Sequence, residues 1–169
     1  GLETRFLRYF TLTTDGDYCD FPGKKYQLST NGTSGFDGMA QISYSPCYEL
    51  SMFIRYKYKN RHKDFTPDGG EKITLPYIQQ KWKYQLSYSP VDELMLKTMV
   101  DVVHNAYQRQ EPSQGILVGQ SVGYKFRKLP LQLDLSAAWF QTDDYASRIS
   151  LYEKGLLYSF NFPSFYGKG

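Results

Sequence analysis

Residues 41–52 read QISYSPCYELSM, and residues 85–96 read QLSYSPVDELML. The phrase Gln-apolar-Ser-Tyr-Ser-Pro returns at residue 85, and both copies carry Glu-Leu at the same offset. A phrase that repeats within so short a chain indicates a repeated structural unit rather than a catalytic motif. Proline cannot donate to a strand ladder, so Ser-Pro is expected to end one strand and form the turn of a β-hairpin.

Apolar residues occupy alternate positions on both sides of each turn. Alternation with a period of two predicts a pleated strand that has one apolar and one polar face. A third hairpin is expected to turn at Lys128-Leu129-Pro130. The predicted strands cover residues 36–44, 48–58, 78–88, 116–126 and 131–139, and a further strand begins at Gly1.

The connections between these hairpins are longer and polar, at residues 13–35, 60–74, 105–115 and 141–147. Short turns therefore alternate with long loops along the chain. In an up-and-down sheet, all short turns would lie at one end and all long loops at the other. That asymmetry is typical of bacterial outer-membrane barrels, which have short periplasmic turns and long external loops.

The pattern predicts an all-β fold, an antiparallel up-and-down transmembrane β-barrel. About eight strands are expected in a single domain over residues 1–169, either as a whole barrel or as part of a larger one. The predicted strands are long enough to cross a bilayer, which takes about 9–11 tilted residues. The 16 Tyr, 11 Phe and 2 Trp are consistent with aromatic girdles at the membrane surfaces. A soluble lipocalin-like barrel that binds a small ligand is the alternative, since it also has about eight strands.

In the membrane interpretation, the apolar positions meet lipid and the charged positions meet the lumen. The residues expected to face lipid are Ile78, Trp82, Tyr84, Leu86, Tyr88, Leu133, Leu135 and Trp139. Those expected to face the lumen are Arg55, Lys81, Lys83 and Lys125.

Composition narrows the class of function further. The net charge of +3 is too small to indicate nucleic-acid binding. Mean hydropathy is −0.54, and no apolar run approaches the ~20 residues of a transmembrane helix. No signal peptide precedes the first strand, so the chain is expected to be a mature protein or a piece of a longer one.

The stretch from Gly119 to Gly169 carries a resemblance. Its Asp-Asp-Tyr-x-Ser-Arg-Ile run at 143–149, Tyr-Glu at 152–153 and Leu-Leu-Tyr-x-Phe at 156–160 resemble the C-terminal part of a family of large outer-membrane β-barrel proteins. Those barrels often follow a periplasmic helix-hairpin-helix segment, which is absent from this sequence. The resemblance implies the cell outer membrane of a Gram-negative bacterium and further strands beyond this chain.

Residues able to support catalysis are few. His62 and His104 have no metal-ligand spacing, and no nucleotide-binding or nucleophile motif is present. Asp15, Asp17 and Asp20 lack the glycine and distal glutamate of a calcium loop. The adjacent Asp143 and Asp144 are expected to form a turn rather than an acid–base pair. The sequence therefore predicts no enzyme activity, no cofactor and no metal site.

Cations cluster where the strand after the first Ser-Pro is expected to reach a long loop. Arginine and lysine bind phosphate well, so these side chains are candidates for contact with lipopolysaccharide phosphates, although a solvated strand end is the simpler interpretation. The cluster consists of Lys57, Lys59, Arg61 and Lys63, with His62 among them.

The expected function is that of a porin-like structural, transport or assembly component of the outer membrane. Its expected partners are outer-membrane lipids, lipopolysaccharide, and the rest of its own barrel or other outer-membrane subunits. Cys19 lies in the first long connection and Cys47 in a short turn, so the two are expected at opposite membrane faces without a disulfide. A competing interpretation makes residues 24–30 a spanning strand and would permit the bond.

Overall fold

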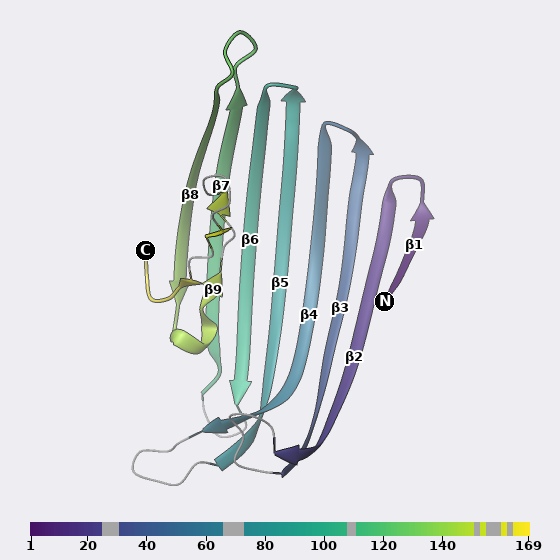
Figure 1. Ribbon diagram of the computed structural model, residues 1–169, viewed down its shortest axis with the longest axis vertical. Coiled ribbons are helices and arrows are strands. Elements are labelled where there is room, and N and C mark those ends of the chain that lie inside the picture. Colours follow the sequence, from purple (N-terminus) through teal and green to yellow (C-terminus); the bar gives the residue numbers. More distant parts are fainter. Residues whose placement is uncertain (25–30, 66–72, 108–110, 151–152, 155–159, 162–163) are drawn as a thin grey trace.

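The computed structural model describes residues 1–24, 31–65, 73–107, 111–150, 153–154, 160–161 and 164–169. The described chain is all-β, apart from one 3₁₀ turn, and its main element is an eight-stranded antiparallel sheet in sequential order (Figure 1). The fold class is thus confirmed at this level. The strands are β1 (Leu2–Leu7), β2 (Phe10–Lys24), β3 (Asn31–Cys47), β4 (Leu50–Phe65), β5 (Ile73–Val91), β6 (Leu94–Tyr107), β7 (Ser113–Lys125) and β8 (Gln132–Thr142).

The sheet is open rather than closed. Among the described strands β1 and β8 form its two edges and do not pair with each other. β1 covers only one end of β2, from Leu2 opposite Thr14 to Leu7 opposite Phe10. At the other edge, Gly169 exchanges backbone hydrogen bonds of 2.8 and 3.0 Å with Phe140 of β8, and the backbone oxygen of Gly167 accepts from the Thr142 N–H at 2.7 Å.

The short turns gather at one end of the sheet and the longer connections at the other, as predicted (Figure 1). The position of the turns differs slightly from the prediction. Each Ser-Pro lies inside its strand, where the ladder shifts register between Tyr44 and Cys47 and again between Tyr88 and Val91. The Ser-Pro pairs therefore form β-bulges, one of the few places where a strand tolerates proline. The two residues that follow each bulged strand make the turn.

The repeated bulge also joins consecutive hairpins. The backbone N–H of Ser45 donates to the carbonyl of Tyr9 in the preceding turn at 3.0 Å, and that of Ser89 donates to Glu49 at 2.7 Å. At the same place in the third hairpin, Lys125 donates to Glu93 at 2.8 Å. Three strands are thus tied to the turn before them, and in β3 and β5 the donor is the serine of the bulged Ser-Pro pair.

The first long connection was predicted wrongly. Most of residues 13–35 belongs to β2 and β3, which pair from Phe10 opposite Tyr44 to Lys24 opposite Asn31. Residues 25–30, which the competing interpretation placed in a spanning strand, lie outside the described residues. The predicted separation of the cysteines holds, because Cys19 pairs with Gly35 whereas Cys47 ends the same strand β3 at the turn end. At about 3.3 Å per residue, those positions on β3 are roughly 40 Å apart, and both thiols are free.

After β8 the chain returns over one face of the sheet. A 3₁₀ turn, η1 (Tyr145–Ser147), contacts β6 and β7, and β9 (Ile149–Ser150) follows it against β7 (Figure 1). β9 pairs with β12 (Ser164–Phe165), and the remaining short ladder joins β10 (Glu153–Lys154) to β11 (Phe160–Asn161).

The returning segment is held by local polar contacts and a small apolar core. Asp143 exchanges hydrogen bonds with the backbone of Gln114 at 2.9 Å, and Asp144 caps η1 by accepting from the Ser147 N–H at 3.0 Å. This confirms that the two aspartates form a turn. The core consists of Met99, Val103, Leu117 and Ile149, with Phe140 and Phe165 packed against it. No helix in the described ranges is long and apolar enough to cross a membrane.

Gly115 of β7 permits this close docking. A Cβ atom at this position would lie 2.5 Å from the Ser147 carbonyl oxygen and 3.0 Å from Thr142 Cγ2. At Gly119, on the same strand and face, the nearest atom to an added Cβ would be Met99 Cε at 3.6 Å, an ordinary contact.

We expect Gly115→Ala to displace η1 and β9 from the sheet, at a cost of about 1–3 kcal/mol, since an inserted methyl group would overpack the contact. Faster amide hydrogen exchange in residues 143–150, with β4–β6 unchanged, is the expected result. Gly119→Ala is the matched control and should leave exchange in that segment as it is. Equal effects of the two variants would contradict the close-docking argument.

Candidate functional site

The strongest concentration of charge lies at the centre of β4 and β5. Within both strands, odd-numbered residues share one face, and Arg55, Lys57, Lys81 and Lys83 fall on it. We call this side the polar face, since it also carries Gln79 and Gln85 of β5. The opposite, apolar face carries the even-numbered side chains of these strands.

The register sets like charges directly opposite each other. Arg55 pairs with Lys83 and Lys57 pairs with Lys81. Opposed like charges destabilise a sheet, whereas opposite charges stabilise it. Two consecutive unfavourable pairs therefore occupy the middle of the longest ladder of the sheet.

The described residues compensate only part of this charge. Lys83 Nζ lies 3.2 Å from Asp101 Oδ2 of β6, and both side chains are largely withdrawn from solvent. Arg55 donates from Nε to Gln41 Oε1 at 2.7 Å, a neutral acceptor, and its guanidinium lies 5.1 Å from the ring centre of Phe53. In the described part of the chain, no carboxylate lies within ion-pair distance of Lys57 or Lys81.

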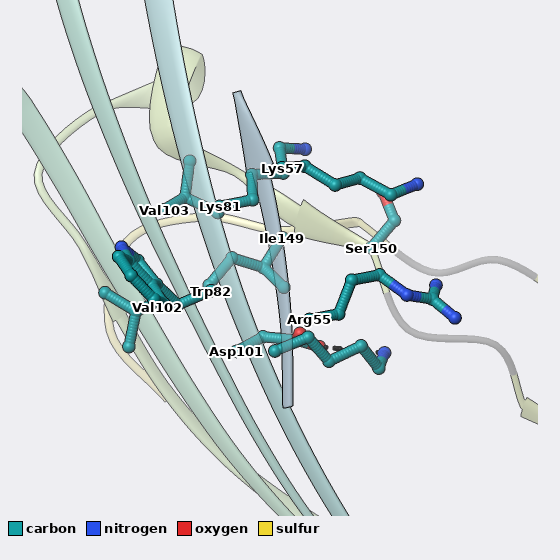
Figure 2. Close-up of a pocket in the computed structure, with 10 residues that line it drawn as sticks. Arg55, Lys57, Lys81, Trp82, Asp101, Val102, Val103, Ile149 and Ser150 are labelled. Atoms are coloured by element: carbon teal, nitrogen blue, oxygen red, sulfur yellow. Dashed lines mark hydrogen bonds and ion pairs between the residues drawn. The ribbon is translucent and has the colours of Figure 1, made fainter. Parts of the chain in front are cut away.

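These side chains border a cavity of about 220 Å³, which we call the cationic cavity. Among the described residues, its charged lining consists of Arg55, Lys57, Lys81, Lys83 and Asp101, that is four cations and one carboxylate, which together carry a charge of +3. β9 provides another wall through Ile149 and Ser150. Figure 2 shows Arg55, Lys57 and Lys81 extending to the side of the sheet on which Ser150 lies.

The cluster predicted to meet lipopolysaccharide is placed differently from the expectation. β4 continues to Phe65, so the cluster lies within a strand rather than where a strand enters a loop. Lys59 and Arg61 both form ion pairs with Asp37 of β3. Lys63 Nζ lies 4.0 Å from the ring centre of Tyr77. Both residues lie on the polar face of the strands β4 and β5 that carry the cationic cavity.

The other predicted sets separate by face. The residues predicted to meet lipid share the apolar face, as the ladders from β4 to β8 connect them: Ile78, Trp82, Tyr84, Leu86, Tyr88, Leu133, Leu135 and Trp139. Arg55, Lys81 and Lys83, predicted to meet a lumen, line the cationic cavity. Lys125 lies on the same face but at the turn end of β7, opposite Gln132 and outside the cavity.

The remaining candidates form no reactive group in the described ranges. His62 Nδ1 lies 3.1 Å from the backbone oxygen of Ser34, and His104 lies on the apolar face opposite Gln80. Asp15, Asp17 and Asp20 are exposed along β2, and Asp15 pairs with the terminal amine. No group of three potential metal ligands occurs among the described residues.

The sequence identified the cations of the cavity one by one, but it did not predict that they would line a common cavity. It assigned Lys57 to a headgroup contact. Alternation places Asp101 on the polar face, but the sequence did not reveal its ion pair with Lys83 or the wall formed by β9. The cross-strand register is what brings these residues together, and alternation alone does not reveal which residue of β4 lies opposite which residue of β5.

Comparison of this chain with protein-family models, with curated proteins and with solved structures finds no match.

We expect Lys57→Glu to stabilise the sheet by about 0.2–1 kcal/mol, because it replaces a like-charge pair with Lys81 by an opposite-charge pair. Chemical denaturation monitored by circular dichroism measures the change. Lys125→Glu makes the same charge change opposite the neutral Gln132 and should leave the unfolding free energy within experimental error. A lower stability for Lys57→Glu would show that the two lysines are not in repulsive contact.

Proposed function

We propose that this chain is part of an outer-membrane β-barrel, with its apolar face against lipid and its polar face toward a lumen. The proposal rests mainly on the exposure of the apolar face. Ile54 is 54 % exposed, Leu135 61 % and Trp139 52 %, although all three are large apolar residues in the interior of long strands. Exposed apolar surface that spans several strands is typical of a membrane or protein interface.

Burial on the polar face supports the same orientation. The small apolar core and the buried Asp101 and Asn105 lie on that side, where η1 and β9 cover the sheet. A water-soluble sheet would bury its apolar face and expose its charges, as antiparallel sheets that face water on one side normally do. The arrangement here is inverted, as it is in barrels whose outside is apolar and whose interior is polar.

The open edges imply additional strands. Backbone N–H and C=O groups at a sheet edge cannot remain unpaired in hydrocarbon, so a membrane-spanning sheet must close. β1 spans only six residues, so much of β2 has no neighbour among the described strands on the side away from β3. We infer that other strands complete the barrel, either from a longer form of the same chain or from other outer-membrane subunits.

The resemblance of residues 119–169 to large outer-membrane barrel proteins is consistent with this proposal. In such a barrel the chain acts as a structural, transport or assembly component, with no chemistry of its own. Lipopolysaccharide contact by residues 57–63 is not part of the proposal, because their odd-numbered cations lie on the polar face.

A soluble lipocalin-like barrel is the alternative. In that fold the apolar face would turn inward around a ligand, and Trp82 and Trp139 would line a binding site. Both residues lie on the apolar face, and the chain has two tryptophans in all. Tryptophan fluorescence therefore reports whether the apolar face meets lipid or lines a ligand site.

In liposomes that contain brominated phospholipids, we expect the fluorescence of Trp82 and Trp139 to fall strongly, since bromine quenches only by contact within the acyl region. Single Trp82→Phe and Trp139→Phe variants report on each site. Fluorescence that is unaffected by brominated lipid, together with saturable binding of an apolar dye in buffer, would instead support the lipocalin-like alternative.

A matched control moves the tryptophan to the other face. Phe53 lies on the polar face, opposite Ser43 and Gln85. A triple variant with Trp82→Phe, Trp139→Phe and Phe53→Trp should be far less sensitive to brominated lipid, because its indole would face the lumen. Equal quenching would contradict the assigned orientation.

The cysteines test which end is external. We expect a membrane-impermeant maleimide to modify Cys19 in intact cells of the producing organism, and Cys47 only after the outer membrane is permeabilised. The reason is that Cys47 adjoins a short turn and Cys19 lies toward the end with long connections. Cys19→Ser and Cys47→Ser variants identify each site, and labelling of Cys47 alone would mean the opposite orientation.

A further inference from the structure

We propose that the cationic cavity binds a small soluble oxyanion that carries two or more negative charges, such as a phosphate or a diphosphate. The inference rests on the proposed function only for its biological role, as a site inside a lumen. The binding itself follows from the cavity and its charges.

The first argument is the unfavourable charge arrangement. Arg55 opposite Lys83 and Lys57 opposite Lys81 place four cations around one space. Asp101, the one carboxylate among the described residues of its lining, is engaged by Lys83. Local features that oppose stability without compensation are expected at functional sites. A bound multivalent anion would convert both repulsive pairs into attractive contacts.

The second argument is the donor geometry. The Arg55 Nε bond to Gln41 Oε1 fixes the guanidinium and leaves its terminal amino groups to bind an oxyanion in a bidentate manner. Lys57 and Lys81 supply compact charges on flexible stems, which adjust to oxygens at different positions. Figure 2 shows these three side chains reaching toward the same space.

The third argument is size and shielding. The volume of about 220 Å³ is several times the roughly 30 Å³ share of one water molecule, so a hydrated phosphate or a diphosphate fits. The buried side chain of Ile149 forms part of the wall, and apolar walls strengthen the attraction between a charged cleft and its counter-ion.

The position of the cavity favours a soluble anion over a lipid headgroup. Lys57 lies near the middle of β4 and Lys81 near the middle of β5. If the sheet spans the membrane, the cavity lies at mid-depth on the lumen side, away from both headgroup layers. In an outer-membrane barrel, it would then concentrate anionic solutes along the passage.

The test is calorimetric titration of inorganic pyrophosphate into the purified chain, in zwitterionic detergent or in buffer, whichever keeps it monodisperse. We expect saturable binding that weakens as salt is added. The double variant Lys57→Gln with Lys81→Gln should lose at least tenfold in affinity. Lys125→Gln removes one charge from the same face outside the cavity and should bind as the unaltered protein does.

The Lys57→Glu variant tests whether a loss of pyrophosphate binding could be caused by misfolding. It should abolish pyrophosphate binding while it raises the unfolding midpoint, which separates loss of a ligand site from loss of structure. Undetectable binding by the unaltered protein, or an equal loss in Lys125→Gln, would overturn the proposal. So would displacement of pyrophosphate by phosphatidylglycerol vesicles, since this would identify a headgroup site.

The two proposals fail separately. Pyrophosphate binding by a protein whose tryptophans escape brominated lipid would leave the oxyanion site intact and remove the membrane role. Strong quenching without pyrophosphate binding would support the membrane role and overturn the oxyanion site.

Discussion

The register of the backbone ladder is the constraint on which the rest of this structure depends. Side chains alternate with a period of two, so a slip of one residue would move every cation of a strand to the apolar face. From Leu50 opposite Tyr88 to Phe65 opposite Ile73, the β4–β5 ladder runs without a shift. The bulges of β3 and β5 lie at the turn end, where they tie hairpins together without disturbing the faces in the middle of the sheet.

The two faces of the sheet differ in which side chains are exposed and which are buried. On the apolar face, strand after strand presents large side chains that remain exposed, and this is costly in water and favourable in lipid. On the polar face, charged and amide side chains bond across strands, as Arg61 does with Asp37 and Tyr77 with Asn105 at 2.8 Å. The burial of polar groups and the exposure of apolar ones are what we propose a sheet with hydrocarbon on its outside would show.

The segment after β8 turns a flat charged surface into a cavity. Its docking depends on short-range contacts: the Asp144 cap, the Asp143 bonds to Gln114 and the missing side chain at Gly115. Leu117, which is fully buried, anchors Ile149 against the sheet. Without that wall, the cations of β4 and β5 would be open to solvent, and high dielectric would weaken both their repulsion and any attraction for an anion.

The sequence by itself determined the local geometry of this protein. Alternation of apolar and polar residues specifies strands and their two faces, and the repeated Ser-Tyr-Ser-Pro marks the turn end. It did not reveal how far β2 and β3 extend from the turn end, because stretches such as Asp15–Asp20 and Gly32–Gly35 have weak strand propensity. Their pairing is imposed by neighbouring strands, since strand preference depends on the context of the sheet.

Only the tertiary structure decided which charges meet. Lys57 and Lys81 are far apart in the chain, and Asp101 and Ile149 are farther still, yet one ladder and one returning segment bring them to a common cavity. Alternation assigns each residue to a face but carries no information on its position along the neighbouring strand. That position is set by the bulges, the turns and the backbone hydrogen bonds, which form only when the whole sheet assembles.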